Sequence, residues 1–125
     1  MNTQAAAISY YSNSTRSVGT RHSNEYAVVS HITQKLRAAE EHKASNFPHF
    51  VEMLTLNRKL WQNFGADVAE PDNQLPKSLK AKIFYLAEFV DQHTRLVLKG
   101  TESAIDLIEI NDTILQGLRN QGGPS

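Results

Sequence analysis

Residues 107–118 read LIEINDTILQGL, and their apolar residues recur with the spacing of an α-helix. When this stretch and the residues just before it are placed on a helix at about 100° per residue, polar and apolar side chains separate onto opposite sides. The apolar side is formed by Ala104, Leu107, Ile108, Ile110, Ile114, Leu115 and Leu118. Asn111 is the exception, because it falls in the middle of that apolar side. The stretch therefore predicts an amphipathic helix whose buried side contains one carboxamide.

Two segments nearer the start of the chain show the same helical spacing. The first is expected to run from a cap at Ser23 or Asn24 to about Lys43. The second is expected to begin near Phe47, with Pro48 in a first-turn position where proline is tolerated. Apolar residues cover nearly half the circumference of this second helix, so it should contact at least two neighbours.

A third helical pattern begins at Pro76 and ends at Gly100, a residue suited to the left-handed conformation that often ends helices. Thr101 is then expected to cap the fourth helix directly. The apolar stripe of the third helix is widened by Phe84, Tyr85, Phe89 and Leu96. Since no segment shows sustained strand alternation, the predicted fold class is all-α, a small bundle of about four antiparallel helices with a flexible N-terminal arm.

The length of 125 residues suits a single domain. We assign residues 23–119 to the helical domain. Residues 1–22 are rich in Ser, Thr, Asn and Gln and show little apolar periodicity, which predicts a flexible N-terminal arm. Residues 120–125, NQGGPS, are expected to form a disordered tail.

Charge and composition exclude several classes of protein. Lys and Arg total 13, as do Asp and Glu, so the formal net charge is zero. Proteins that act mainly by binding the phosphates of nucleic acids usually carry a clear excess of positive charge. We therefore do not expect the isolated chain to bind nucleic acid directly. The sequence has no cysteine, which excludes disulfides and thiolate metal sites. It shows neither a secretory signal nor a membrane-spanning segment, which favours a cytoplasmic protein without membrane contact.

The histidines form no recognisable catalytic or metal-binding pattern. His49 and Glu52 have the spacing of two ligands on one helical face, but Glu52 falls on the polar side and the sequence offers no third ligand beside them. His93 falls within an apolar side, which is more typical of a core or interface histidine than of a catalyst. With no phosphate-binding loop and no nucleophile motif, we predict no catalytic residue, no metal site, no cofactor and no enzymatic activity.

Three carboxylates, Glu102, Asp106 and Glu109, recur at helical spacing on the polar side of the last helix. A face of this kind is usually only solvated. The alternative is a docking strip for a basic partner.

A second carboxamide, Asn57, lies in the middle of the apolar side of the second helix, as Asn111 does on the fourth. An amide left unpaired in a core costs roughly 1–3 kcal/mol, so both should form hydrogen bonds. In one interpretation the two amides pair inside the bundle and set its register. In the other, the two apolar sides stay partly open and form a groove with a few polar fixed points, which receives an amphipathic helix of a partner.

Four stretches, in this order and spacing, resemble the FlaF family of flagellar biosynthesis regulators from α-proteobacteria. These stretches are LNRKLW (56–61), the segment ending in PDNQLP (67–76), FVDQHTRLVLKG (89–100) and LIEINDTILQGL (107–118). The resemblance covers roughly residues 23–118.

The resemblance implies a regulatory role without catalysis. FlaF-like proteins support flagellin production and export together with FlbT, a regulator that acts on flagellin messenger RNA. The expected partners are thus flagellin and an FlbT-like regulator, with the protein acting as an adaptor or as a secretion-chaperone-like protein. The rival hypothesis is a regulator that binds flagellin messenger RNA directly, and a second copy of the chain could also close an apolar helix face.

We place the hypothetical partner-binding surface on the second and fourth helices. It comprises Asn57, Arg58, Trp61, Phe64, Ile110, Asn111, Ile114 and Leu118. Trp61 would be its anchor if exposed, because Trp and Arg dominate interface hot spots, although a lone Trp in a wide apolar arc is more often part of a core.

Overall fold

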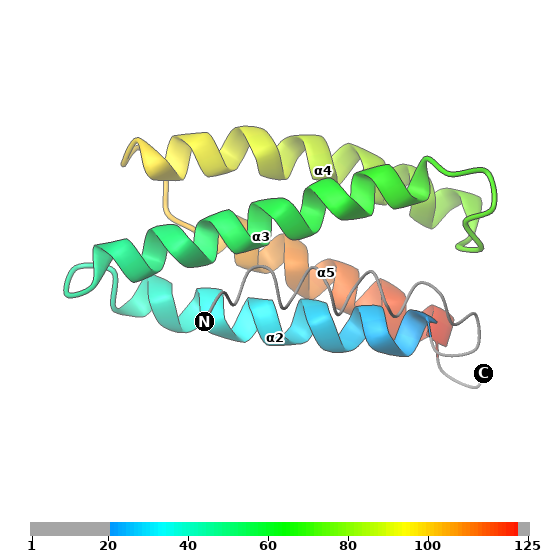
Figure 1. Cartoon of the computed structure of the whole chain (residues 1–125), viewed down its shortest axis with the longest axis horizontal. Coiled ribbons are helices and arrows are strands. Elements are labelled where there is room, and N and C mark those ends of the chain that lie inside the picture. The colour runs from blue at the N-terminus through cyan, green and yellow to red at the C-terminus, as the bar shows by residue number, and fades with distance from the viewer. Residues whose placement is uncertain (1–20, 123–125) are drawn as a thin grey trace.

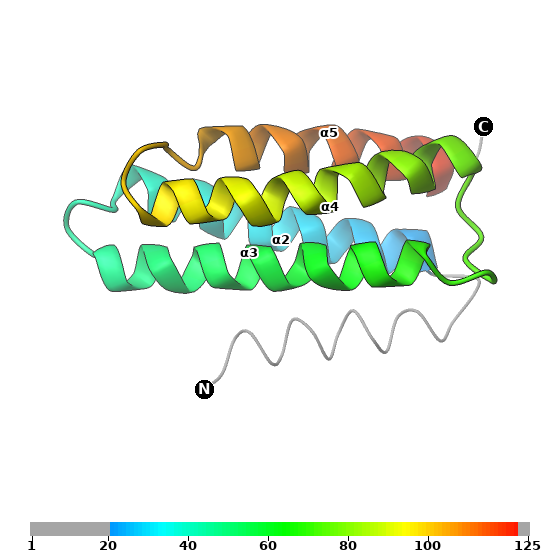
Figure 2. The ribbon, with the colours of Figure 1, turned by 90° about the horizontal axis from the view of Figure 1, so that it is seen from above.

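The computed structural model describes residues 21–122, and this part of the chain is entirely helical apart from its connecting loops. The helices are α2 (Arg21–Glu41), α3 (Phe47–Val68), α4 (Lys77–Leu98) and α5 (Ile105–Gly122). Consecutive helices run in alternating directions (Figures 1 and 2). Each helix packs on the next, and α5 returns to pack on α2, so α3 and α5 lie diagonally across the bundle. The predicted all-α bundle of four helices is confirmed; the predicted arm, residues 1–22, lies almost wholly outside the described residues.

The second predicted helix begins where the sequence placed it. The Asn46 side chain caps α3 by accepting a hydrogen bond from the backbone N–H of His49, at 3.4 Å, and Pro48 occupies the first turn.

The loop that follows α3 is organised by Asn73. Its amide donates to the Asp67 carboxylate at 2.9 Å, and its oxygen accepts from the N–H of Leu75 at 3.0 Å. Leu75 is thereby held in the core.

Gly100 ends α4 as predicted, with φ of 85°. The N–H of Gly100 donates to the carbonyl of Val97 and the N–H of Thr101 donates to that of Leu96, at 3.0 and 3.1 Å. This is the Schellman pattern of helix termination. Because glycine lacks a Cβ, it adopts the positive φ of this turn without the strain that other residues experience there.

The predicted cap at Thr101 is wrong. Its hydroxyl donates back to the carbonyl of Leu96 at 3.0 Å, so Thr101 completes the end of α4. At the start of α5, Ser103 Oγ accepts from the N–H of Ile105 at 3.3 Å, and the Glu40 carboxylate of α2 accepts from the N–H of Ala104 at 2.7 Å. A capping group supplied by another helix cannot be recognised from local sequence.

Two other helix boundaries differ from the prediction. The first helix begins by Arg21, so Ser23 and Asn24 lie within it rather than at its cap. The last helix continues to Gly122, so residues 120–122 of the expected disordered tail are helical; residues 123–125 lie outside the described residues. The polar residues beyond Leu118 carry no apolar periodicity, but polar residues extend a helix readily once its preceding turns are packed.

The core fills the space between all four helices. Its largest fully buried side chains include Trp61 and Phe50 of α3, Ile32 and Leu36 of α2, and Leu107 and Leu118 of α5. Trp61 and Phe64 pack edge to face, with ring centroids 5.5 Å apart. The bundle thus closes over the apolar sides of α2, α3 and α5. No helix in residues 21–122 combines the length and the apolar character that a membrane crossing requires.

Candidate functional site

The two asparagines of the apolar sides meet inside the bundle. Asn111 Nδ2 donates to Asn57 Oδ1 at 2.8 Å, and Asn111 Oδ1 accepts from Trp61 Nε1 at 2.8 Å. All three side chains are completely buried. The interpretation in which the amides pair inside the bundle is therefore confirmed. The network joins α3 to α5 across the diagonal of the bundle, where a shift of one helix would break both bonds.

This closure contradicts the predicted partner-binding surface. Of its eight residues, six are buried: Asn57, Trp61, Phe64, Asn111, Ile114 and Leu118. The prediction that these side chains form an accessible groove is wrong for the folded monomer, because the neighbouring helices cover both apolar sides. Arg58 and Ile110 are partly exposed, but they lie at different places on the surface.

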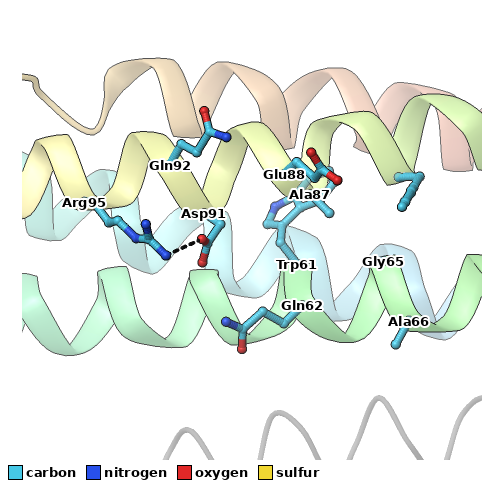
Figure 3. Close-up of a pocket in the computed structure, with 10 residues that line it drawn as sticks. Trp61, Gln62, Gly65, Ala66, Ala87, Glu88, Asp91, Gln92 and Arg95 are labelled. Carbon is cyan, nitrogen blue, oxygen red and sulfur yellow. Dashed lines mark hydrogen bonds and ion pairs between the residues drawn. The ribbon is translucent and has the colours of Figure 1, made fainter.

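Arg58 of α3 pairs with Asp91 of α4, and Asp91 and Arg95 line a groove between these two helices. Arg58 Nε lies 2.6 Å from Asp91 Oδ1. Arg95 Nη2 lies 3.1 Å from the other oxygen of Asp91 (Figure 3). The hydrogen bond from Arg58 is the main reason that the pKa of Asp91 is lowered, and the positive charge of Arg95 acts in the same direction. Arg58 and Arg95 are therefore both paired with a carboxylate of the protein itself.

The floor of this groove is shaped by close helix packing. A Cβ placed on Gly65 of α3 would lie 3.2 Å from the Cβ of Ala87 on α4, so a larger residue at this position would push the helices apart. The groove has a volume of about 540 Å³, and its lining combines charged and amide side chains with apolar ones, among them Trp61 and Phe84. Its paired charges and amide side chains make it more polar than the groove between α4 and α5.

A second groove lies between α4 and α5 and is more apolar. Its walls include Leu86 and Phe89 of α4 and Ile110 of α5, and its volume is about 280 Å³. Charged residues stand at its rim, with Lys82 on α4 and the carboxylates Asp106 and Glu109 on α5. Ile110, which belongs to the predicted partner-binding surface, lines this groove.

Surplus apolar surface is concentrated on α4 beside this groove. Tyr85, Phe89 and Leu96 are 72%, 38% and 42% exposed. At 100° per residue these three side chains fall within about 40° of one another, so they form one stripe along the helix. The apolar groove and this stripe, defined by Tyr85, Leu86, Phe89, Leu96 and Ile110, are here called the α4–α5 surface.

The sequence contained one signal for this surface. Phe84, Tyr85, Phe89 and Leu96 widen the apolar stripe of the third predicted helix, but the pattern could not show which part of a wide arc its neighbours would leave uncovered. α4 packs more extensively on α3 than on α5. Phe89 lies in the groove toward α5, where this packing is looser, whereas the exposed Phe84 lies in the groove toward α3.

His49 and His93 lie in different environments, one at the surface and one in the interior. His49 and Glu52 are 3.7 Å apart at the surface, and no third metal-type ligand joins them among the described residues. His93 is buried, as its place in an apolar arc predicted. Its imidazole stacks on Phe89 with ring centroids 5.3 Å apart and an angle of 12° between the planes.

The three predicted surface carboxylates are all exposed. Asp106 and Glu109 lie on α5, whereas Glu102 lies in the loop before it, because the helix begins later than predicted.

Comparison with known protein families identifies a relationship that covers most of the chain. A family model described as flagellar protein FlaF matches residues 7–118 of this chain. The match ends at the residue where the resemblance ends, but it begins within the segment that the sequence predicted to be an arm. No curated protein and no solved structure matches the chain.

Proposed function

The chain belongs to the FlaF family of flagellar proteins, and from this premise we propose that it is a non-enzymatic cytoplasmic adaptor that binds flagellin in concert with an FlbT-like regulator. The observation that supports binding most directly is the α4–α5 surface. It presents an apolar groove next to a stripe of exposed large side chains, which is how proteins receive the apolar face of an amphipathic helix.

Flagellin supplies a partner of this kind, since its terminal segments are amphipathic helices prone to self-assembly. A carrier that covers their apolar faces would keep them from associating before export. Lys82 at one side of the groove and Asp106 and Glu109 at the other provide charges of both signs at its rim. Such rim charges orient a partner helix while the apolar contacts supply most of the affinity.

The site proposed for flagellin differs from the one that the sequence suggested. Asn57, Trp61 and Asn111 stabilise the bundle from inside and do not contact the partner in this proposal. Tyr85 and Phe89 become its anchors, because exposed aromatic residues next to a pocket are the side chains most often found at interface hot spots.

We predict that replacing Tyr85 and Phe89 with Ala weakens flagellin binding without unfolding the protein. Hot-spot residues contribute about 2 kcal/mol or more each, so either substitution should raise the Kd about 30-fold. Isothermal titration calorimetry of the purified full chain with monomeric flagellin measures the effect. Circular dichroism of each variant checks that the helices remain.

Phe47→Ala is the matched control, because Phe47 is 50% exposed but lies at the start of α3. It should bind flagellin as the unchanged protein does. No heat on mixing with flagellin, or an equal loss in the Phe47 variant, would contradict the proposal. A steep fall in affinity for flagellin leader RNA between low and moderate salt would instead favour direct action on the message.

A further inference from the structure

Three metal-type side chains meet where α4 passes into α5. His93 lies in the last turns of α4, Glu102 in the connecting loop, and Asp106 in the first turn of α5. One ligand atom from each residue lies within 4.8 Å of the others. Eight residues lie between His93 and Glu102 in the sequence, and this spacing is not that of a recognised metal-binding motif.

The imidazole of His93 is aimed at the two carboxylates. Its side chain is only 7% exposed, and its Nε2 atom has no hydrogen-bond partner among the described residues. Asp106 Oδ2 is 3.5 Å away from that nitrogen. A buried polar atom without a partner is costly, and the stacking of Phe89 on the ring opposes a rotation that would bring Nε2 to solvent.

We propose that His93 Nε2 and the carboxylates of Glu102 and Asp106 bind a divalent transition-metal ion, with Zn²⁺ the best fit. A tetrahedral ion with ligand distances of about 2.1 Å holds neighbouring ligand atoms about 3.4 Å apart. The distance between His93 Nε2 and Asp106 Oδ2 already has this value within 0.1 Å. Glu102 is exposed in a loop, so its side chain closes the remaining distance by a change of rotamer.

The donor set also selects the ion. An imidazole nitrogen suits Zn²⁺, Co²⁺ and Ni²⁺, whereas Mg²⁺ and Ca²⁺ prefer sites made entirely of oxygen. Two carboxylates balance the charge of a divalent ion. The exposed carboxylates leave the ion open to solvent on one side, so water completes its coordination.

The position of the site gives it a structural consequence. Its ligands come from α4, the connecting loop and α5, so a bound ion ties the loop to both helices. α4 packs less extensively on α5 than on α3, and the ion would therefore strengthen the looser contact of α4. The proposal concerns the isolated chain and does not depend on flagellin binding.

Titration of the metal-free full chain with ZnCl₂, followed by calorimetry, tests the proposal. We expect one ion per chain. Glu102→Gln and Asp106→Asn should each weaken binding at least about tenfold, and His93→Gln should do the same. Thermal unfolding should shift upward by about 10 °C when free Zn²⁺ is about 100 times the Kd.

The controls separate this site from adventitious binding. Glu109→Gln removes an exposed carboxylate one turn further along α5. His49→Gln removes the surface histidine that lies beside Glu52. Both variants should bind Zn²⁺ with the same Kd as the unchanged protein. Glu102 lies in an exposed loop, so its variant remains informative even if the buried His93 variant fails to fold. Absence of binding, equal losses in the control variants, or equal affinity for MgCl₂ would overturn the proposal.

Discussion

At the scale of single residues, Asn111 links two helices that lie diagonally across the bundle. It accepts a hydrogen bond from Trp61 and donates one to Asn57, all out of contact with solvent. Asn57 Nδ2 has no hydrogen-bond partner among the described residues. The network therefore already contains one unpaired donor. Removing Asn111, its central member, would leave further buried groups unpaired and should lower the stability of the protein strongly.

We predict that Asn111→Ala lowers the free energy of unfolding by about 3 kcal/mol. Trp61 Nε1 and Asn57 Oδ1 would each lose a partner in the interior, at about 1–3 kcal/mol per group, and a small cavity would form. Urea denaturation measures the change.

Asn63→Ala on α3 is the matched control, because the Asn63 amide donates to the Lys59 carbonyl near the surface and forms no other side-chain hydrogen bond within residues 21–122. It should change stability by less than about 0.5 kcal/mol. A double-mutant cycle of Asn57→Ala and Asn111→Ala should give a coupling of about 0.5–3 kcal/mol. Additive effects of the two substitutions would show that the amides do not act together.

At the scale of elements, helix ends were predictable where one residue's own chemistry decides them. Gly100 ends α4 because glycine adopts positive φ, and Pro48 fits the first turn of α3. The start of α5 was not predictable, since Glu40 of α2 supplies a capping oxygen from another part of the chain. Thr101 was therefore assigned to the wrong helix, although its hydroxyl does bond a helix end.

Gly100→Ala is expected to destabilise the protein by about 1 kcal/mol. A Cβ at this position would meet nothing within 4 Å, so the cost comes from the positive φ alone. Gly100→Asn should cost less, because Asn tolerates the left-handed conformation better than Ala. Thermal unfolding of the two variants makes the comparison, and an alanine variant as stable as the unchanged protein would mean that the turn relaxes to another conformation.

At the scale of the whole molecule, the bundle is unevenly packed. α2 and α5 pack extensively on each other and so do α3 and α4, whereas α4 and α5 share the smallest contact among the neighbouring pairs described. The apolar groove lies at this contact and contains the exposed Phe89. The surface that we propose for flagellin thus lies at the least extensive of these helix contacts.

Hydrogen exchange should reveal this unevenness. We expect backbone amides in the middle of α4 to exchange faster than those in the middle of α2 and α5, because few buried contacts and a solvent-exposed side favour local opening. Mass spectrometry of the exchanging protein resolves the helices. Equal protection of all four helices would show that the bundle opens only as a unit.

The sequence by itself determined the all-α class, the four helices found in residues 21–122, the end of α4 at Gly100 and the kinship with FlaF. These features follow from periodicity, from the chemistry of single residues and from the order of short motifs. Only the tertiary structure decided which apolar sides are closed. Periodicity shows that one side of a helix is apolar, but exposure depends on neighbours that the pattern does not contain. For that reason Trp61 and the paired amides lie inside, while Tyr85 and Phe89 remain at the surface.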